Sequence, residues 1–575
     1  MSERSTRRLT NGFNLLVDAL QANGVRNMYG VVGIPVTDVA RLAQARGMRY
    51  IGFRHEASAG NAAAIAGFLT RRPGVCLTVS APGFLNGLVS LAAATVNCFP
   101  MIQISGSSER PVVDLQRGDY EELDQFSSAK PFAKAAYRVD RPEDIGLATA
   151  RAVRAAVAGR PGGVYLDIPA TVLGATLDAA RGAESIFSPV DPAPLQPPDS
   201  ASVGRALDLL SRARRPLVVL GKGAAYAQAD ESIRTFIERT GIPFLPMSMA
   251  KGLLPDGHPR SAAAARSFTV GSADVVFMVG ARLNWMLRHG EPPLWNPDAK
   301  FIQVDVAATE FDSNRPIAAP ILGDIRSVFD VLVKRLEEYP VQAPKEWIDE
   351  IEGHKAKNVE KMAARLAAPH APMGFYGALR VIKEVIADHP ETYLVNEGAN
   401  TLDFGRDIID IHRPRHRLDT GTWGVMGIGM GYAIAAAVET GDPVIVVTGD
   451  SAFGFSGMEV ETVCRYKLPV VTLVFNNGGV YKGDAVNTES ADPAPTVLMH
   501  DARYDRIAEA FGAAGHNATT PEELDSALRQ AMASKKPAVI NCVIDPALGT
   551  ESGHLQNLNP QSSLPETTPK TKQTA

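Results

Sequence analysis

Two polar side chains stand just past two apolar runs late in the chain. Residues 443–450 read PVIVVTGD and include Asp450, and residues 469–477 read PVVTLVFNN and end in Asn477. Such runs predict strands of a parallel sheet that is covered on both faces. Because the carboxyl ends of parallel strands meet at one edge of a sheet, Asp450 and Asn477 are expected to lie close together.

These residue types suit a metal ion that bridges a diphosphate. Mg²⁺ prefers oxygen ligands, and the carboxylate of Asp450, the amide oxygen of Asn477 and the backbone carbonyl of Gly479 supply three. Gly449 lets a ligand approach the backbone closely, and a helix expected to begin near Gly457 would offer free amide groups to the anion. Each motif alone is more typical of an ordinary strand-end turn, but the two together favour a ligand site.

Composition places the chain among ordinary soluble proteins. Its 575 residues are 45% hydrophobic and 21% charged, and a chain of this length is expected to form several domains. The net charge of −5 is close to neutral for this length and gives no indication of nucleic-acid binding. No run of about 18 apolar residues occurs, so we expect no signal peptide, no membrane span and a cytoplasmic location. The four cysteines have no paired spacing and are expected to be buried free thiols: Cys76, Cys98, Cys464 and Cys542.

The order of apolar runs and Ala-rich stretches predicts α/β architecture throughout, with doubly wound parallel sheets. Pro-rich residues 188–200 predict an extended linker, and the Pro-bounded, charged stretch 340–374 predicts a helix that crosses between two domains. We therefore predict three domains and a flexible polar tail, with the limits 1–187, 201–340, 372–554 and 555–575.

The pair of motifs at residues 449–450 and 476–477 resembles the metal and diphosphate motif of thiamine diphosphate-dependent enzymes, although Ser451 stands where many members have glycine. The resemblance implies three doubly wound parallel-sheet domains of the decarboxylase type: an N-terminal domain that binds the pyrimidine, a central nucleotide-binding domain and a C-terminal domain that binds diphosphate and Mg²⁺. It also implies that each site joins the N-terminal domain of one chain to the C-terminal domain of another. A homodimer is then the minimum active unit, and a homotetramer is expected.

Glu56, in the segment YIGFRHEASAG, stands where a predicted strand gives way to a helix of small residues. Alone it reads as an acidic residue favoured at a helix N-terminus, but the resemblance implies a carboxyl group that hydrogen-bonds the cofactor's aminopyrimidine. In the segment GTWGVMGIGMG, Met426 falls at the family's apolar wedge. The full set of residues that the resemblance places at the cofactor is Glu56, Tyr376, Ala399, Asn400, Thr401, Gly424, Met426, Gly449, Asp450, Ser451, Ala452, Asn477 and Tyr481.

Longer segments, among them YGVVGIP, SAPGFLNG, GDYEELDQ, NEGAN and ESGHL, resemble the oxalyl-CoA decarboxylases over almost the whole chain. This resemblance implies conversion of oxalyl-CoA to formyl-CoA and CO₂ in oxalate degradation. It implies that Glu56 acts in catalysis and that Tyr120, Glu121, Tyr481 and Ser552 hold water or substrate near the reacting carbon.

The resemblance also implies two sites for phosphate-bearing molecules. Coenzyme A would contact Ala265, Arg266, Arg406 and Ser552. The same basic stretch contains Arg413, Arg415 and Arg417, and for Arg413 and Arg415 a solvated surface is as good an interpretation as a contact with coenzyme A. ADP, an expected activator, would bind in the central domain at Arg160, Lys222, Arg282, Asp305, Asp324 and Ile325.

Three rival functions remain open from the sequence. A 2-hydroxyacyl-CoA lyase shares the fold and the cofactor but needs room for an alkyl chain. An acetolactate synthase-like transferase with FAD is disfavoured because the central domain resembles the ADP-binding pattern. A catalytically silent nucleotide-binding subunit is disfavoured because Glu56, Asp450 and Asn477 are all present.

Overall fold

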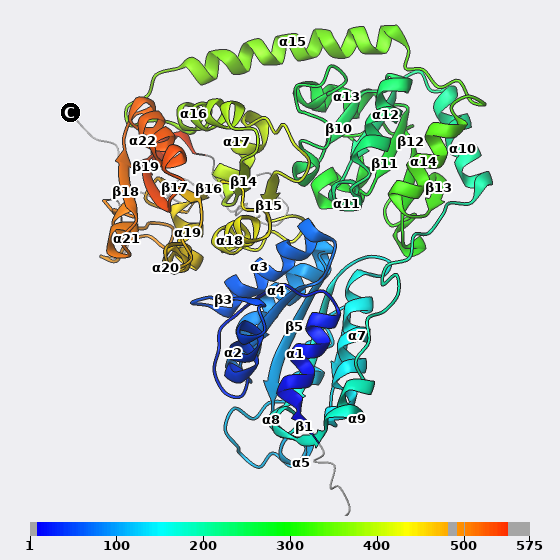
Figure 1. Ribbon diagram of the computed structural model, residues 1–575. Helices are drawn as coiled ribbons and strands as arrows, with labels where there is room; N and C mark the ends of the chain where they lie inside the picture. Colours follow the sequence, from blue (N-terminus) through cyan, green and yellow to red (C-terminus); the bar gives the residue numbers. More distant parts are fainter. Residues whose placement is uncertain (1–7, 481–490, 500, 550–575) are drawn as a thin grey trace, which may run out of the picture.

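The computed structural model describes residues 8–480, 491–499 and 501–549. Three parallel sheets, each with helices on both faces, follow one another along the chain, which confirms the predicted α/β class (Figure 1). The N-terminal domain lies below the other two domains in the view of Figure 1. A small antiparallel pair, β1 with β8, also occurs in the N-terminal domain and was not expected from the sequence.

The N-terminal sheet has six parallel strands in the order β3-β2-β4-β5-β7-β6. Its inner strands β2, β4, β5 and β7 are almost wholly buried, as the continuous apolar runs predict. The elements of this domain are β1 (Leu9–Asn11), α1 (Gly12–Ala22), β2 (Asn27–Gly30), α2 (Thr37–Ala45), β3 (Arg49–Gly52), α3 (Glu56–Thr70), β4 (Gly74–Thr78), α4 (Pro82–Asn97), β5 (Met101–Ser107), α5 (Arg110–Val113), α6 (Gln125–Ala129), β6 (Ala135–Arg138), α7 (Ile145–Val157), β7 (Gly163–Pro169), α8 (Ala170–Gly174), β8 (Thr176–Asp178) and α9 (Ala179–Glu184).

The central sheet has five parallel strands in the order β10-β9-β11-β12-β13. Residues 188–199 form no helix or strand, in agreement with the predicted linker. The elements of the central domain are α10 (Ser200–Ser211), β9 (Pro216–Leu220), α11 (Lys222–Ala227), α12 (Asp230–Thr240), β10 (Phe244–Pro246), α13 (Arg266–Ser272), β11 (Val275–Val279), β12 (Lys300–Asp305), β13 (Ile317–Leu322) and α14 (Ile325–Arg335). The long charged helix α15 (Lys345–Ala367) then crosses from the central to the C-terminal domain, as predicted (Figure 1).

The C-terminal sheet has six strands in the order β15-β14-β16-β17-β19-β18, which repeats the strand order of the N-terminal sheet. Its elements are α16 (Phe375–Asp388), β14 (Tyr393–Asn396), α17 (Ala399–Ile408), β15 (Arg417–Asp419), α18 (Gly429–Thr440), β16 (Val444–Gly449), α19 (Asp450–Ser456), α20 (Val460–Arg465), β17 (Val470–Asn476), α21 (Asp505–Ala510), β18 (Ala514–Ala518), α22 (Pro521–Ser534) and β19 (Ala538–Val543).

The expectation that a helix begins near Gly457 is wrong, because α19 already begins at Asp450. Gly449 is extended and occupies the N-cap position, and an acidic residue in the first turn is favoured by the helix dipole. The helix therefore starts directly at the strand end, and its first turn contains Asp450.

Helices of small residues join the N-terminal and C-terminal domains. Helix α3 packs against α18, and both are rich in Ala and Gly (Figure 1). A Cβ atom added to Gly431 would lie 2.5 Å from the backbone oxygen of Ser58, so the two helices approach too closely for any larger residue there. This contact sets the start of α3 relative to the C-terminal sheet.

Candidate active site

The topology of the C-terminal sheet places its crevice between β14 and β16. Strand β14 pairs with β15 on one side and with β16 on the other, so the connections leave β14 in opposite directions. Ligands of doubly wound sheets bind at such a switch point, outside the carboxyl ends of the strands. The segments that leave this edge are residues 397–401 after β14 and residues 449–452 after β16.

Asp450 is buried at this edge and joins β16 to the turn after β17. Its Oδ2 accepts hydrogen bonds from the backbone N–H groups of Gly478 (2.8 Å) and Gly479 (3.2 Å), and its Oδ1 accepts one from Ser451 (2.7 Å). Gly478 has φ +74°, which favours glycine. Burial raises the pKa of Asp450 to about 6, and the backbone hydrogen bonds oppose that rise. Asn477 is buried in the same turn, so the predicted pair is brought together.

The residues present fit a divalent cation and a diphosphate. The described residues contain no cluster of three or more His, Cys, Asp or Glu side chains that could hold a metal. A cation at this edge would therefore combine the Asp450 carboxylate with amide and carbonyl oxygens, a ligand set suited to Mg²⁺ shared with phosphates. Cβ atoms added to Gly424, Gly449 or Gly454 would meet no atom within 4 Å, so space for a ligand remains beside each.

The other residues predicted at the cofactor come from elements around the same crevice. Gly398 has φ +95°, and α17 begins after it with Ala399, which is exposed, and the buried Asn400 and Thr401. Tyr376 on α16 packs its ring 5.4 Å from that of Phe404 on α17. The segment that leads into α18 contributes Gly424 and the partly buried Met426, and Ser451 and Ala452 lie in the first turn of α19.

Glu397 is a residue that the sequence interpretation missed. It follows β14 directly and is 1% exposed. Its Oε2 accepts a hydrogen bond from the Ile428 N–H (2.8 Å), and its Oε1 accepts one from the Thr448 hydroxyl (3.1 Å). Burial raises its pKa to about 7. The segment NEGAN indicated a loop, but a carboxylate in a polar loop gives no sign that it is buried.

Glu56 is the first residue of α3, as predicted, and is 8% exposed. Within the described residues its carboxylate hydrogen-bonds to Asn86 of α4 (3.1 Å) and to no group of the C-terminal domain. The side chain of His55 caps α3, because its Nδ1 accepts a hydrogen bond from the Ala57 N–H (3.1 Å). Among the residues described in one chain, no hydrogen bond therefore joins Glu56 to the Asp450 turn.

The backbone before Glu56 is held by another carboxylate that the sequence did not reveal. Glu459, 1% exposed and located between α19 and α20, accepts hydrogen bonds from the N–H groups of Arg54 (3.1 Å) and His55 (3.0 Å). The Thr462 hydroxyl donates a further hydrogen bond to it (2.7 Å). Thus the C-terminal domain positions the start of α3 through backbone contacts.

Of the four other predicted catalytic residues, the structure describes Tyr120 and Glu121, and within the described chain neither forms a hydrogen bond with Glu56. Tyr120 is 71% exposed, and Glu121 has φ +54° in the same loop between α5 and α6. Tyr481 and Ser552 lie outside the described residues. The proposed roles of these four residues stay predictions.

Two of the predicted coenzyme A residues come together from different domains. Arg266 begins α13, directly after the buried Ala265, and Arg406 lies on α17. Burial, and then the charge of Arg406, lower the pKa of Arg266. The Nε atom of Arg406 is buried and has no hydrogen-bond partner among the described residues. Two neighbouring guanidinium groups with an unused donor are suited to bind an anion.

The other arginines of that cluster have different surroundings. Arg415 forms a bidentate ion pair with Asp230 of α12 (both contacts 2.8 Å). Arg417 is fully buried, where it donates to Ser248 and Asn396. Arg413 is exposed. Arg415 and Arg417 therefore stabilise the packing of the domains, so the surface interpretation of the sequence applies to Arg413 alone.

The predicted ADP residues gather at the switch point of the central sheet. Strand β9 lies between β10 and β11, and Lys222 follows β9 while Arg282 follows β11. Arg160 and Arg282 both face Glu310, which the sequence did not single out, and the Arg282 guanidinium donates to the Val96 carbonyl (3.2 Å). Lys222 Nζ donates to Asn97 Oδ1 (2.6 Å), and burial lowers its pKa to about 7.

The remaining predicted ADP residues lie on neighbouring elements. Burial raises the pKa of Asp305, at the end of β12, and Arg160 and Arg282 oppose that rise through their charges. Asp324 caps α14 by accepting hydrogen bonds from the N–H groups of Arg326 and Ser327, and Ile325 is the first residue of that helix. Because Asp324 is already engaged as a cap, its backbone is better placed than its carboxylate to contact a ligand.

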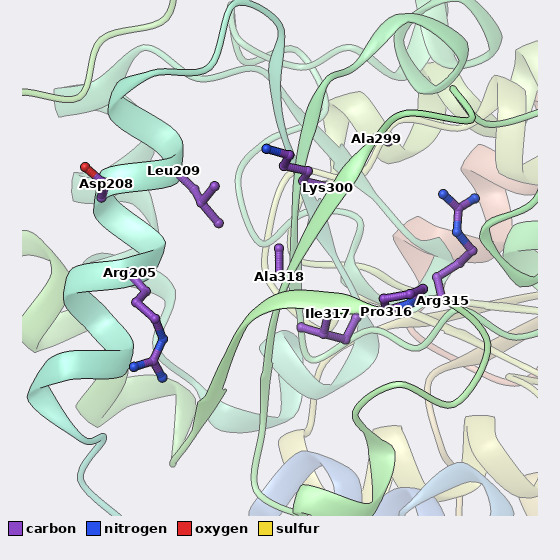
Figure 2. Close-up of a pocket in the computed structure, with 9 residues that line it drawn as sticks. All are labelled: Arg205, Asp208, Leu209, Ala299, Lys300, Arg315, Pro316, Ile317 and Ala318. Carbon is purple, nitrogen blue, oxygen red and sulfur yellow. The ribbon is translucent and has the colours of Figure 1, made fainter.

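A separate pocket of about 440 Å³ lies at the outer edge of the central sheet. Figure 2 shows α10, with Arg205, Asp208 and Leu209, beside the strands that carry Lys300 and Ile317. None of the residues predicted to bind a ligand lines this pocket. Its position gives no reason to move the candidate site away from the C-terminal switch point.

No helix of the described residues is both long and apolar enough to cross a membrane. This finding agrees with the absence of an apolar run in the sequence.

Comparison with known proteins identifies the family to which the chain belongs. Models of the thiamine pyrophosphate enzymes, another name for the thiamine diphosphate enzymes, match three parts of the chain: the N-terminal TPP binding domain at residues 10–128, the central domain at 203–332 and the C-terminal TPP binding domain at 398–542.

Three relatives match over nearly their whole length. Oxalyl-CoA decarboxylase of Escherichia coli K12 is 58% identical over 96% of this chain and 98% of its own. The 2-hydroxyacyl-CoA lyase of Oryza sativa is 47% identical over 96% and 98%, and the human 2-hydroxyacyl-CoA lyase 1 is 41% identical over 95% and 96%. The chain therefore belongs to the thiamine pyrophosphate enzyme family, in the group that contains oxalyl-CoA decarboxylase and 2-hydroxyacyl-CoA lyase.

Proposed function

We propose that this protein is a carboxy-lyase that converts oxalyl-CoA to formyl-CoA and CO₂, with thiamine diphosphate and Mg²⁺ as cofactors, in oxalate degradation in the cytoplasm. The observation that carries the proposal is the identity to an oxalyl-CoA decarboxylase, which exceeds the identity to the 2-hydroxyacyl-CoA lyases by more than ten percentage points. Cleavage of a 2-hydroxyacyl-CoA to formyl-CoA and an aldehyde is the competing reaction.

The residues of the C-terminal domain would hold the diphosphate end of the cofactor. Asp450, Asn477 and the carbonyl of Gly479 would bind Mg²⁺, and the first turn of α19, with Ser451 and Ala452, would face the diphosphate. When bound, thiamine diphosphate supplies a carbanion stabilised by a positively charged ring, which accepts the electrons released as CO₂ leaves. Met426 would border the cofactor on its apolar side.

The residues of the N-terminal domain would act on protons and on the surroundings of the reacting carbon. Glu56 would share a proton with a ring nitrogen of the pyrimidine, and its burial keeps competing water away from that proton. The exposed loop with Tyr120 and Glu121, together with Tyr481 and Ser552, would border the substrate. No group in this set needs to act as a strong base, in line with a decarboxylation.

Recognition of the substrate would depend on positive charge at the domain boundary. A thioester of coenzyme A carries phosphates, and Arg266 and Arg406 supply two guanidinium groups with an unused donor. Ala265, which directly precedes Arg266, completes the predicted set in the described residues and is buried.

Completion of the site would require a second copy of the chain. The contacts of Glu56 within one chain are with α4 and not with the Asp450 turn. Large apolar side chains are also exposed on the elements near both, among them Leu85 and Val89 of α4, Trp423, Phe455 and Met458. Exposed apolar groups of this kind mark interfaces. We propose a homodimer as the minimum active unit and a homotetramer as the assembled form.

The central domain would bind ADP as an activator. Its switch point gathers the cations of Arg160, Lys222 and Arg282, which suit a diphosphate, and the carboxylate of Asp305 could accept hydrogen bonds from a ribose. Asp324 and Ile325 complete the predicted set.

The test of the proposed reaction uses purified protein with thiamine diphosphate and Mg²⁺. Incubation with oxalyl-CoA should consume the thioester and release equal amounts of CO₂ and formyl-CoA. In a parallel incubation, a long-chain 2-hydroxyacyl-CoA should be cleaved far more slowly. Faster aldehyde release from the second substrate would instead assign the lyase reaction.

A further inference from the structure

Glu397 is a fully buried carboxylate in contact with three segments that border the candidate cofactor site. It is 1% exposed and follows β14 directly. Its backbone oxygen accepts a hydrogen bond from the Thr401 hydroxyl, in the segment after β14. Its carboxylate accepts hydrogen bonds from the Thr448 hydroxyl, at the end of β16, and from the Ile428 N–H, before α18.

The charge of Glu397 is compensated by backbone amides. Among the described residues no ion pair involves Glu397, whereas the Ile428 N–H donates a hydrogen bond to its carboxylate, and the N–H groups of Gly427 and Gly429 also act on it and lower its pKa. These amides form the N-terminal end of the 12-residue helix α18, where the helix dipole favours a negative charge. A buried carboxylate with such partners favours one arrangement of the chain, since any other would leave a charge or several donors unpaired.

Packing allows little freedom around that carboxylate. A Cβ atom added to Gly429 would lie 2.6 Å from Glu397 Oε1, so any larger residue at this position would force the buried carboxylate or the helix to shift. The segment in front of the helix has two further glycines with positive φ, Gly424 (+68°) and Gly427 (+81°). A segment so rich in glycine has many conformations open to it, and the contact with Glu397 selects one.

We infer that Glu397 is a positioning residue: its carboxylate joins the segment Gly424–Ile428 to the carboxyl ends of β14 and β16 and so sets where Met426 lies relative to Asp450. The inference rests on the proposed function in that Met426 and Asp450 border the cofactor. Glu397 itself, bound by the backbone and by Thr448, is not expected to touch substrate.

The test compares Glu397→Gln with the matched control Glu439→Gln. Glutamine keeps the size of the side chain but removes the charge that the helix amides stabilise. Glu439 lies near the other end of α18, where its carboxylate accepts a hydrogen bond from the Tyr29 hydroxyl (2.5 Å). The control therefore changes the same kind of group on the same helix, away from the crevice.

Two readouts separate positioning from loss of the fold. The first is the affinity for thiamine diphosphate with Mg²⁺, followed by the fluorescence of Trp423, which lies in the segment before α18 and is 46% exposed. A Trp423→Phe variant identifies the signal. The second is the split between kcat and KM for oxalyl-CoA. The cofactor titration needs no substrate, so it remains valid even if the proposed reaction is wrong.

We expect Glu397→Gln to bind the cofactor about tenfold or more weakly, and to lose kcat by ~10²-fold with KM changed less than about threefold, because displaced groups at a cofactor or metal cost about this much. Glu439→Gln should match the parent protein in both readouts. A Glu397→Gln protein that binds cofactor and turns over within about twofold of the parent would overturn the inference.

A second variant covers the case in which Glu397→Gln does not fold. Gly429→Ala keeps the carboxylate but places a methyl group against it, which should displace the segment before α18 and weaken cofactor binding in the same direction. Circular dichroism at 222 nm shows whether each variant retains its helices. Unchanged cofactor affinity in a folded Gly429→Ala protein would also contradict the inference.

Discussion

Three buried carboxylates, Asp450, Glu397 and Glu56, have different hydrogen-bond partners. Asp450 accepts hydrogen bonds from the turn after β17, Glu397 from the start of α18, and Glu56 from a side-chain amide. Burial raises the pKa of both Asp450 and Glu397. A cation beside Asp450 would lower the pKa of that carboxyl again, since an opposite charge favours the ionised form.

Removal of the metal should inactivate the protein reversibly. Excess chelator should abolish CO₂ release, and added Mg²⁺ should restore it. Asp450→Asn removes the charge and should raise the Mg²⁺ concentration needed for half-maximal activity by ~10- to 100-fold. A variant with the Mg²⁺ requirement of the parent protein would show that Asp450 does not bind the metal.

Arg406→Ala should weaken recognition of coenzyme A. Because the variant loses a charged donor to a phosphate, its KM for oxalyl-CoA should be at least about 10-fold higher than that of the parent protein, and its kcat should be nearly unchanged. Arg413→Ala is the matched control, because Arg413 is exposed and belongs to the same basic stretch. Equal KM values for the two variants, measured by steady-state kinetics, would remove Arg406 from the substrate site.

At the scale of elements, the sequence was most informative about strands. The apolar runs PVIVVTGD and PVVTLVFNN did form β16 and β17, because strands covered on both faces must be apolar throughout. The edge strands β6 (AAYR) and β18 (AGHNA) are partly exposed and carry no such run, so the sequence does not mark them.

The start of α19 and the role of Glu397 could not be predicted for a related reason. Local sequence shows where a polar loop follows a strand, but not whether an acidic residue in it meets the amides of a distant helix. The contact of Glu397 with Ile428 spans 31 positions in the chain. Likewise, the hydrogen bonds of Glu459 to residues 54 and 55 join two domains. Such contacts depend on the tertiary fold.

Glu459→Ala should therefore destabilise the start of α3. It would leave the backbone N–H groups of Arg54 and His55 and the Thr462 hydroxyl without their acceptor, which costs about 1–3 kcal/mol in the free energy of unfolding. Urea denaturation measures that loss. The same variant should lower kcat, since Glu56 directly follows the two released amides, and a variant with unchanged stability and kcat would rule out this role.

The ADP site should respond to pH through Lys222. Burial lowers the pKa of this lysine to about 7, so its ammonium form is present below that pH and is lost above it. Affinity for ADP should therefore fall as pH rises from 6.5 to 8.5, as measured by calorimetry. Lys222→Met should bind ADP weakly at both values and lose most of the pH dependence. A parent protein whose affinity is constant across this range would contradict the assignment.

At the scale of the molecule, the N-terminal and C-terminal sheets share one strand order and are held together by α3 and α18. The general fold could be predicted because alternating apolar runs and helices admit few topologies. The domain limits 1–187, 201–340 and 372–554 stay a prediction. The proposed pairing of Glu56 with the Asp450 turn would be a property of two chains, so it could not be read from composition or from one folded chain.

The most direct test of a shared site mixes two inactive variants. At a Mg²⁺ concentration that only just saturates the parent protein, Glu56→Ala and Asp450→Asn should each be nearly inactive alone, although Glu56→Ala should still bind the cofactor through its diphosphate. If Glu56 of one copy serves the cofactor held by the other, a mixed dimer has one site with both residues intact. After the subunits have exchanged, the mixture should release CO₂ from oxalyl-CoA at about a quarter of the parent rate. A mixture as inactive as its components would contradict the shared site.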